Sequence, residues 1–400
     1  MNCDPNSYKH HFVIVLVLVS SLCVLCGRTA AQDFRTVHPG IEYALVHHKL
    51  GADPVKINLL RLDLTKVRLD VHHALDAAIG VEKASSIAVR HKAVAAINAG
   101  FFRLDKSPFA GDAAGLLVVD GELLSESFLS RIALVLGAVD LVEFDHLDAF
   151  PRFYHHRFTV PELMGINREQ KKGEAIIYSS HFGHRTATGK GSTEIVLDKC
   201  AKTYCRSFLI NEGEGNSTIP RRGYVIAFDP MENATHRDFI ARVKQLIAGP
   251  KRDRVFQVVP FVASANWYAK LGLGGYPDIV AGVPQLIKNG KVDITWEQEK
   301  AGRSFAEMRH PRTAVAKLKD GKFLMITVDG RQPGVSVGMN LYELADYLLS
   351  LGAIDAMNLD GGGSTTMFLD GRVVNTPSDK EGERKVSDAI LVTLRKNPRR

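Results

Sequence analysis

The feature that most constrains the fold of this chain is a run of three glycines at the end of an apolar segment. The segment from Ala353 to Leu359 predicts a buried strand, and Asp360 and Gly361–Gly363 follow it. Glycine loses more backbone entropy on folding than any other residue, so three in a row indicate positive φ angles or close approach of other groups to the backbone. A tight turn capped by Asp360 needs only one or two glycines. The pattern therefore favours a binding site over a simple turn.

A hairpin is expected before this segment. Residues 312–318 and 322–328 predict two strands, and Asp320-Gly321 is typical of the turn between them. If these two residues form the whole loop, Arg312 lies opposite Asp329. This pairing predicts that the two side chains lie close together.

A helix is expected between the second of these strands and the strand that ends at Asp360. Asn340 and Glu343 form a variant capping box, an apolar face follows, and Gly352 ends the helix. Strand, helix and strand predict a right-handed crossover between parallel strands. Because parallel strands end at the same edge of a sheet, Asp329 and Asp360 are expected at that edge, where ligands usually bind.

Two other segments are expected near the glycines. Asn98 ends a predicted strand and is followed by Ala99 and Gly100. A final hairpin, turning at Asp370-Gly371, is expected to return residues 375–379 to the side of Gly363 and Ser364.

The first residues predict export. Fifteen mostly apolar residues, Phe12 to Cys26, follow Lys9, and small residues at Thr29 and Ala31 suit cleavage before Gln32. The apolar stretch is shorter than the roughly 20 residues of a membrane helix, although an uncleaved anchor stays open as an alternative. We expect residues 1–31 to be a signal peptide and the chain to be secreted or periplasmic, with no stable membrane span after leader removal.

Composition and cysteine content narrow the class further. The net charge of +7 indicates affinity for polyanions, but the basic residues form no dense run with interleaved aromatic residues, so we expect no nucleic-acid partner.

Cys200 and Cys205 are predicted to form a small-loop disulfide, because no further ligand pair accompanies them for a metal. His181 and His184, on a Gly-rich loop, predict surface or substrate contact. Without repeats or linkers, residues 32–95 are expected as a β-rich segment and 96–396 as the main domain.

The expected constellation suits a sugar joined through phosphate. Two aspartates around one site suit glycosidic cleavage, one as proton donor and the other as nucleophile or base. Guanidinium groups such as those of Arg312 and Arg331 bind phosphate oxygens in bidentate fashion. Each residue alone also has a structural explanation: Asp329 as a turn residue, Arg312 as its ion-pair partner, and Asn98 as the cap of a strand end.

Several of these segments resemble the phosphodiester glycosidase family. The resemblance rests on residues 309–314, 327–331, 358–365 and 374–378, with weaker similarity at 98–102 and 115–121. It implies an α+β fold with a mixed β-sheet and flanking helices, and an active site at the residues named above. The expected catalytic residues are Asp329 and Asp360, and the expected substrate-binding residues are Asn98, Arg312, Arg331, Gly361, Gly362, Gly363, Ser364, Thr365, Asn375 and Ser378.

The resemblance implies a hydrolase that cleaves the glycosidic bond of a sugar-1-phosphodiester. With a leader of bacterial type, a cell-wall, capsular or exopolysaccharide component is the expected substrate, and a glycosyl phosphodiester or anionic glycan the expected partner. Ala99 replaces a glycine usual in the family, so the backbone approach there is expected to be less close.

Three alternatives stay open. A non-catalytic polysaccharide-binding protein would need aromatic platforms, for which only Phe101, Phe102, Trp267 and Tyr268 are available. A metal-dependent phosphodiesterase would use Asp329 and Asp360 as ligands, so the cofactor prediction leaves a divalent cation open. A serine hydrolase is disfavoured, because Ser364 is not in a Gly-x-Ser-x-Gly elbow.

Overall fold

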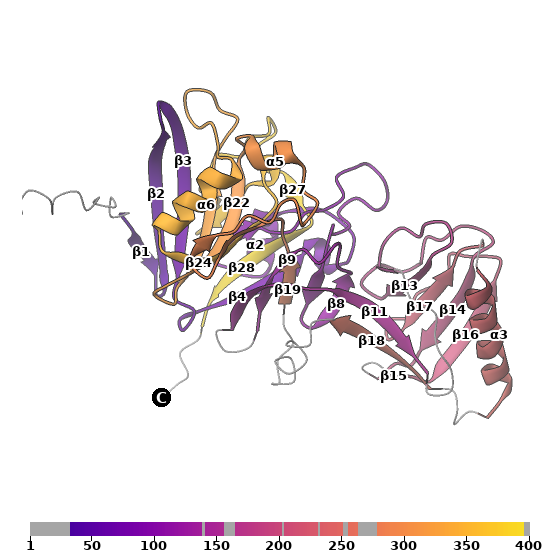
Figure 1. Cartoon of the computed structure of the whole chain (residues 1–400). Coiled ribbons are helices and arrows are strands. Elements are labelled where there is room, and N and C mark those ends of the chain that lie inside the picture. The colour runs from indigo at the N-terminus through magenta and orange to yellow at the C-terminus, as the bar shows by residue number, and fades with distance from the viewer. Residues whose placement is uncertain are drawn as a thin grey trace, which may run out of the picture. The chain divides into compact units, whose positions relative to one another are not determined.

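The structure is a computed structural model, and it describes residues 33–137, 141–155, 165–201, 204–230, 233–250, 255–262 and 278–395 (Figure 1). The predicted signal peptide therefore lies outside the described residues, as do Trp267 and Tyr268. The chain divides into two units, Met1–Asp33 and Phe34–Arg400. No helix among the described residues is long and apolar enough to cross a bilayer.

An eight-stranded sheet forms the centre of the second unit, in the order β1-β2-β3-β23-β22-β24-β20-β21. Its strands are β1 (Arg35–His38), β2 (Ile41–Leu50), β3 (Asp53–Leu62), β20 (Gln285–Lys288), β21 (Lys291–Val292), β22 (Arg312–Leu318), β23 (Phe323–Val328) and β24 (Ala353–Asn358). The chain's β-rich start is part of this sheet, because β3 pairs with β23.

Two five-stranded sheets and a two-stranded ribbon accompany the central sheet. The first, in the order β26-β25-β6-β28-β4, contains β4 (Val67–His73), β6 (Ala95–Asn98), β25 (Met367–Leu369), β26 (Arg372–Val373) and β28 (Asp388–Leu394). The second, in the order β10-β9-β19-β7-β8, contains β7 (Leu117–Val119), β8 (Glu122–Ser125), β9 (Ile132–Leu136), β10 (Val142–His146) and β19 (Asp278–Ala281). The ribbon pairs β5 (Glu82–Lys83) with β27 (Lys385–Val386).

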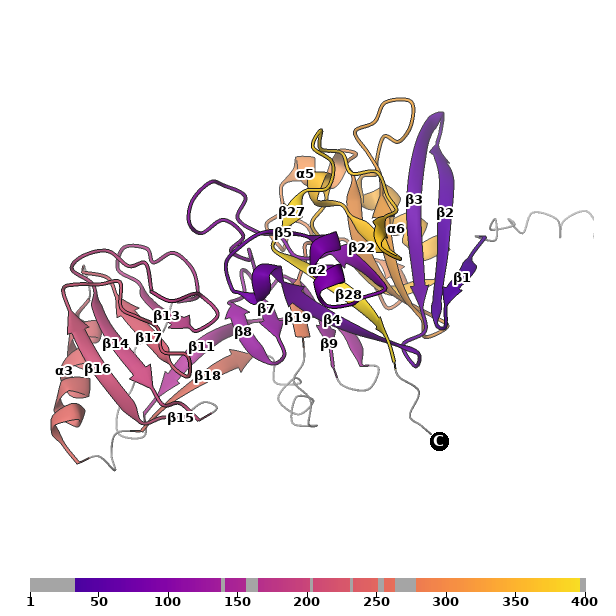
Figure 2. The same cartoon turned by 180° about the vertical axis from the view of Figure 1, so that it is seen from behind.

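Helices cover the central sheet and the sheet that contains β6 (Figure 2). On the central sheet, α5 (Arg303–Glu307) and α6 (Leu341–Ser350) pack over residues such as Leu324 and Ile326. On the sheet that contains β6, α2 (Ala84–Arg90) packs its apolar side over Leu391. The main core lies between the two sheets, where Met325 and Met357 meet Ile97 and Ile390. The hydrophobic effect of burying these side chains from both sheets holds the layers together.

The segment from β11 to β18 forms additional sheets. A three-stranded sheet contains β11 (Ala149–Tyr154), β15 (Tyr204–Cys205) and β18 (Phe256–Val262), and a five-stranded sheet contains β12 (Gly165–Ile166), β13 (Ala175–Ser179), β14 (Thr193–Asp198), β16 (Ser207–Glu212) and β17 (Tyr224–Phe228). One helix, α3 (Ala234–Ala248), follows β17. The predicted disulfide between Cys200 and Cys205 is present, with an S–S distance of 2.00 Å.

The local sequence correctly predicted the cap of α6 and the turn at Asp370-Gly371. Asn340 accepts a hydrogen bond from the backbone N–H of Glu343, and the Glu343 carboxylate accepts one from the backbone N–H of Asn340, which completes the capping box of α6. The Asp370-Gly371 turn has φ angles of 49° and 82°, as a type I′ turn requires. The described part of the chain contains many strands and few helices, which is consistent with the predicted α+β class.

The predicted right-handed βαβ unit is not confirmed. Both β23 and β24 pair antiparallel with β22, which lies between them, so they run in the same direction but are not neighbours. All pairings within the central sheet are antiparallel, and the parallel pairing among the described strands joins β12 to β13. The sheet is therefore not mixed as expected, although β23 and β24 still end at a common edge.

The predicted register of the β22–β23 hairpin was wrong by one residue. Arg312 pairs with Val328, not with Asp329. The loop contains three residues, because the N–H of Leu318 bonds to the carbonyl of Lys322 at 2.9 Å and Gly321 takes a positive φ of 82°. A shift of one residue moves a side chain to the opposite face of a sheet, so Arg312 and Asp329 point to different faces.

The cap of α6 provides a stability test. Replacing Asn340 with Ala removes the acceptor for the Glu343 N–H and is expected to lower the free energy of unfolding by about 1 kcal/mol. Urea unfolding of both proteins measures the difference. Asn340→Asp keeps a capping oxygen and should remain within a few tenths of a kcal/mol of the wild type. An equal loss in both variants would contradict the role assigned to the cap.

Candidate active site

Asp360 lies where the chain leaves the central sheet after β24. Its backbone N–H donates to the carbonyl of Ala99 at 2.9 Å, and its carbonyl accepts from the Asn98 side-chain amide at 2.6 Å. The carboxylate accepts from the N–H of Gly361 at 2.9 Å, and the residue as a whole is partly exposed. Residues at the end of β6 therefore fix the backbone of Asp360, and its carboxyl group lies against the glycine turn.

Each of the three glycines allows another group to approach the backbone. A Cβ atom on Gly361 would lie 2.7 Å from the carbonyl oxygen of Pro311, and one on Gly362 would lie 3.0 Å from Nη2 of Arg331. Gly362 also has a positive φ of 60°. At Gly363, a Cβ would overlap Arg384 and Asp379. The triplet therefore brings two guanidinium groups against the turn, which a simple reversal of the chain does not require.

Arg384 was not among the predicted site residues. Its guanidinium forms an ion pair with Asp379, with Nε–Oδ2 and Nη2–Oδ1 distances of 2.7 and 3.0 Å, and its charge lowers the pKa of Asp360. Both residues lie in a polar stretch, residues 378–385, whose composition is typical of a solvated loop. Only its position against Gly363 distinguishes Arg384 from the other surface arginines.

Burial dominates the electrostatics of Asp360. Desolvation by the surrounding protein raises the pKa of Asp360 to about 6, and the negative charge of Asp388 adds to the rise. The nearby hydroxyl of Ser364, the hydrogen bond from the Gly361 N–H and the charge of Arg384 oppose this rise in the pKa. A carboxyl group with a pKa near neutral pH is typical of catalytic acids and bases.

Arg331 is the second cation at the turn. It is exposed, lies against Gly362, and has a positive φ of 60°, which is uncommon for a residue with a side chain. Its charge, with that of Arg312, depresses the pKa of His310, which burial lowers first. The donors of this guanidinium are accessible to an anion beside Asp360.

Arg312 does not extend toward the glycine turn. It is buried on the helical face of the sheet, and its Nε donates to the carbonyl of Met339 at 2.9 Å. Its Nη2 donates to the carbonyls of Phe305 and Met308 at 2.7 and 3.0 Å, and the guanidinium lies over the Phe305 ring. Because backbone carbonyls occupy these donors, Arg312 holds α5 and the start of α6 in place.

Asp329 is fully buried on the opposite face. Its carboxylate accepts from the Asn375 amide at 3.2 Å and from the Thr376 N–H at 3.0 and 3.1 Å, and Lys56 Nζ lies 3.6 Å away. Burial raises the pKa of Asp329, and these bonds oppose the rise. The final hairpin thus returns Asn375 to the site, as predicted. One strand separates the backbones of Asp329 and Asp360, a spacing of about 10 Å for two strand widths.

The buried side-chain amides of Asn98 and Asn375, two of the predicted site residues, connect the segments of the site by hydrogen bonds. Oδ1 of Asn98 accepts from the Thr313 hydroxyl at 2.8 Å and from the Thr366 N–H at 3.0 Å. The Asn375 amide donates to the carbonyl of Thr365 at 3.0 Å, and its oxygen accepts from the Met367 N–H at 2.7 Å. The bonds of both side chains to the protein indicate that they position the turn.

Three predicted hydroxyls remain without partners. The side-chain oxygens of Ser364, Thr365 and Ser378 are buried and have no hydrogen-bond partner within the described ranges. Buried hydroxyl groups are normally hydrogen-bonded to protein or water. A polar ligand or water at the turn would satisfy them.

A carboxyl group with a raised pKa, on a glycine turn against which two arginines lie, defines a site suited to an anionic carbohydrate. Comparison with known proteins agrees with this class: residues 210–393 match the model of the phosphodiester glycosidase family. The resemblance found in the sequence to that family is therefore confirmed.

Two kinds of relatives support the comparison. The chain is 34% identical over 113 residues to N-acetylglucosamine-1-phosphodiester alpha-N-acetylglucosaminidase from Bos taurus, covering 26% of this chain and 21% of that protein. It therefore spans about a fifth of the length of this relative and of its mouse and human counterparts. A Synechocystis crystal structure shares the fold, with a TM-score of 0.71, 20% identity, and coverage of 91% of this chain and 64% of that one. A Burkholderia pseudomallei protein described as exported has a TM-score of 0.68, 23% identity, and coverage of 85% and 74%.

The raised pKa of Asp360 predicts a pH-dependent effect of mutation. The folded protein keeps the proton on Asp360 up to about pH 6, whereas the unfolded chain releases it near pH 3.8, so the stability that Asp360 contributes falls as the pH rises through this window. Asp360→Asn mimics the protonated form. We expect its free energy of unfolding, relative to wild type, to increase between about pH 4 and pH 7 in urea titrations.

Asp63→Asn provides a control of opposite sign. The hydrogen bond from the Thr65 hydroxyl lowers the pKa of Asp63, so the contribution of this carboxylate is present at neutral pH and is lost as the pH falls through the lowered folded-state pKa. The Asn variant should therefore lose stability relative to wild type as the pH rises toward the unfolded-state pKa of 3.8, and its difference from wild type should stay flat between about pH 4 and pH 7. A flat difference for Asp360→Asn over the same range would show that its folded-state pKa is normal.

Proposed function

We propose that this protein hydrolyses the glycosidic bond of a sugar-1-phosphodiester. The observation that carries the proposal is the glycine turn, where Asp360 has a raised pKa and where Arg331 and Arg384 lie against the glycines that follow it. The carboxyl group would act at the anomeric carbon of the sugar, and the guanidinium groups would bind the phosphate attached to that carbon. The family match and the activity named for the Bos taurus relative support the same reaction class.

The acidity of the leaving group determines which role Asp360 would have in this reaction. Cleavage of the bond between the anomeric carbon and oxygen releases a phosphate monoester, whose second pKa is about 6. Such a group departs without being protonated first, provided that cations stabilise its charge, and Arg331 and Arg384 supply them. Asp360 then acts in its ionised form, either activating a water molecule or attacking the anomeric carbon itself. Its raised pKa makes it a stronger base than an ordinary aspartate.

The second carboxylate has a supporting position in this proposal. Asp329 holds the Asn375–Thr376 segment, and Asn375 in turn holds the carbonyl of Thr365 beside the turn. A direct catalytic role for Asp329 stays a prediction. Asn98 fixes the backbone of Asp360, and Gly361, Gly362, Gly363, Ser364, Thr365 and Ser378 supply the surface on which the sugar phosphate would lie.

The proposed substrate is a component of the cell wall, a capsule or an exopolysaccharide, reached after export. The disulfide between Cys200 and Cys205 supports an oxidising compartment, and a structural neighbour is described as exported. The net charge of +7 favours anionic glycans. A metal-dependent phosphodiesterase is less well supported, because the closely spaced group of metal-ligand atoms found in the described part of the chain includes neither Asp329 nor Asp360.

Removal of the Asp360 carboxylate tests the reaction directly. Asp360→Asn is expected to lower kcat for a synthetic sugar-1-phosphodiester by at least about a hundredfold, measured as released sugar. The wild-type kcat/KM should rise with pH through about 6 and then level off, because the ionised form is active. Asp320→Asn, in the exposed β22–β23 loop, is the control and should leave turnover unchanged. Undiminished turnover by Asp360→Asn, or wild-type activity that falls as the pH rises through 6, would contradict the assignment.

Measurements of KM and melting temperature distinguish Arg331 from Arg312, the two arginines that the sequence predicted to bind phosphate. Arg331→Gln removes charged hydrogen bonds to the phosphate, and KM should rise roughly tenfold or more. Arg312→Lys loses donors to the carbonyls of Met339, Phe305 and Met308, so its melting temperature should fall while KM stays within about twofold. If Arg312→Lys instead raised KM at unchanged stability, the phosphate contact would belong to Arg312.

A further inference from the structure

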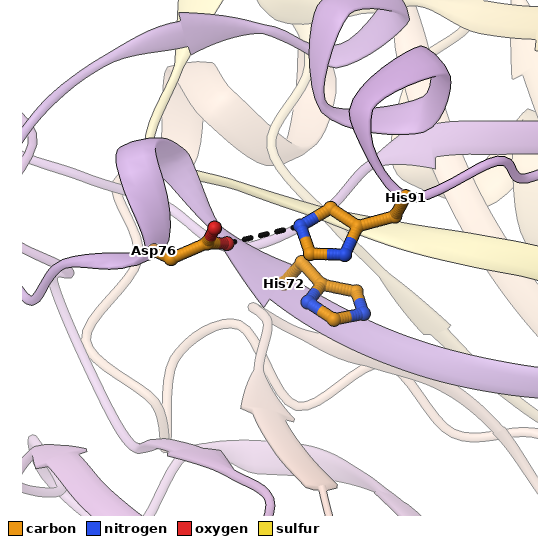
Figure 3. Close-up of side chains that lie close together, drawn as sticks. All are labelled: His72, Asp76 and His91. Carbon is orange, nitrogen blue, oxygen red and sulfur yellow. Dashed lines mark hydrogen bonds and ion pairs between the residues drawn. The ribbon is translucent and has the colours of Figure 1, made fainter.

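A second cluster of chemically active side chains lies away from the glycine turn. It consists of His72 on β4, Asp76 at the end of the 3-10 helix η1 (Ala74–Asp76), and His91 directly after α2 (Figure 3). One ligand atom from each residue lies within 4.8 Å of the others. Nε2 of His91 and Oδ1 of Asp76 are 2.9 Å apart, and the His72 and His91 rings stack with centroids 3.7 Å apart.

The backbone that presents Asp76 is strained. Leu75 and Asp76 have positive φ angles of 60° and 52°, which cost on the order of 1 kcal/mol or more each for residues with side chains. Packing does not explain this conformation, because the Leu75 side chain is 63% exposed. The turn does place the Asp76 carboxylate beside His91.

The cluster opens into a cavity of about 290 Å³. Asp120, Glu122 and His181 line it as well, and Glu122 lies 3.2 Å from Nδ1 of His181. His73 also borders the cavity, but its ring nitrogens lie 3.1 Å from the carbonyls of Ala74 and Gly111, so it is already engaged. Neither ring nitrogen of His72 has a hydrogen-bond partner in the part of the chain that the structure describes.

We propose that His72, Asp76 and His91 bind a divalent first-row transition-metal ion such as Zn²⁺. Two imidazole nitrogens and one carboxylate oxygen are the donor set that such ions prefer, and a water molecule from the cavity would complete a tetrahedron. Tetrahedral zinc with bonds of about 2.0–2.1 Å places its ligand atoms about 3.3 Å apart. The ligand atoms lie within 4.8 Å of one another, so the side chains must adjust their positions for the ion to bind. The stacked imidazoles must tilt apart so that each nitrogen lone pair points at the ion.

Arg90 competes with the ion for this site. Its Nη1 pairs with Oδ2 of Asp76 and lies 3.0 Å from Nε2 of His91. Nε2 of His91 thus has both a donor (Arg90) and an acceptor (Asp76) within hydrogen-bond distance. It can bond to only one of them, because it donates when it carries a proton and accepts when it does not. When the metal binds, Arg90 leaves Asp76 and keeps its second partner, Glu82, whose Oε2 lies 2.8 Å from Nη2.

The metal site is separate from the proposed active site. Successive residues of a strand point to opposite faces. His73 pairs with Asp388, whose charge acts on Asp360, whereas His72 points the other way. A bound ion would tie β4, η1 and α2 together. Its effect is therefore on the stability of this part of the fold, and its test does not depend on the proposed glycosidase activity.

Direct metal binding tests the proposal. The protein is prepared without a histidine tag, treated with a chelator and dialysed, and then titrated with ZnSO₄ by calorimetry, with bound zinc counted by elemental analysis. One Zn²⁺ per chain is expected for the wild type, with a rise in Tm. His72→Ala and His91→Ala should each weaken binding roughly tenfold or more, since even losing an outer partner of a ligand costs that much. Arg90→Gln should tighten binding.

Controls separate this site from adventitious binding. His184→Ala removes an exposed histidine outside the cluster and should leave affinity and stoichiometry unchanged. Melting curves in chelator show whether each apo variant is folded, and Arg90→Gln removes no ligand, so it tests the site even if a histidine variant fails to fold. The proposal is overturned if the wild type retains no stoichiometric zinc, if His72→Ala and His91→Ala bind as tightly as the wild type, or if Arg90→Gln does not tighten binding.

Discussion

The pairing of β22 with its two neighbours governs the chemistry of the edge where β23 and β24 end. Side chains alternate between faces along a strand, so the register decides which polar groups share a layer. With Arg312 opposite Val328, the arginine faces the helices, and Thr313 faces the second sheet, where it bonds to Asn98. A slip of one residue would exchange these two groups, place a cation beside Asp329 and remove the support of the β6 strand end.

Buried amides then connect the layers around the turn. Asn98 joins the central sheet to the segment after Ser364, and Asn375 joins Asp329 to the carbonyl of Thr365. A buried polar group is costly unless its hydrogen bonds are made, so this network specifies one arrangement of the strand ends. The rigidity that results is what a site with a fixed charge geometry requires.

The glycine turn places opposite charges together without neutralising them. Asp360 keeps a raised pKa although two guanidinium groups lie against the same turn, because Arg384 is paired with Asp379 and burial outweighs its attraction. Arg331 lies exposed beside it. The turn thus combines a basic carboxylate with an accessible cation, which cleavage of a bond between sugar and phosphate demands. At the histidine cluster the charges are arranged differently: the guanidinium of Arg90 pairs with Asp76, where the proposed metal ion would bind.

The sequence by itself determined the local structure: the strands around the glycines, the capping box of α6, the type I′ turn at Asp370-Gly371 and the disulfide, because backbone preferences and short-range hydrogen bonds decide these. It also indicated that the end of β6 and the final hairpin meet at the glycine turn. Tertiary structure decided which side chains face each other. One extra loop residue turned Arg312 away, β22 separated β23 from β24, and Arg384 and the His72 cluster were assembled from segments whose composition is ordinary. Contacts between distant segments depend on register and layer packing, and neither is encoded within a short stretch of chain.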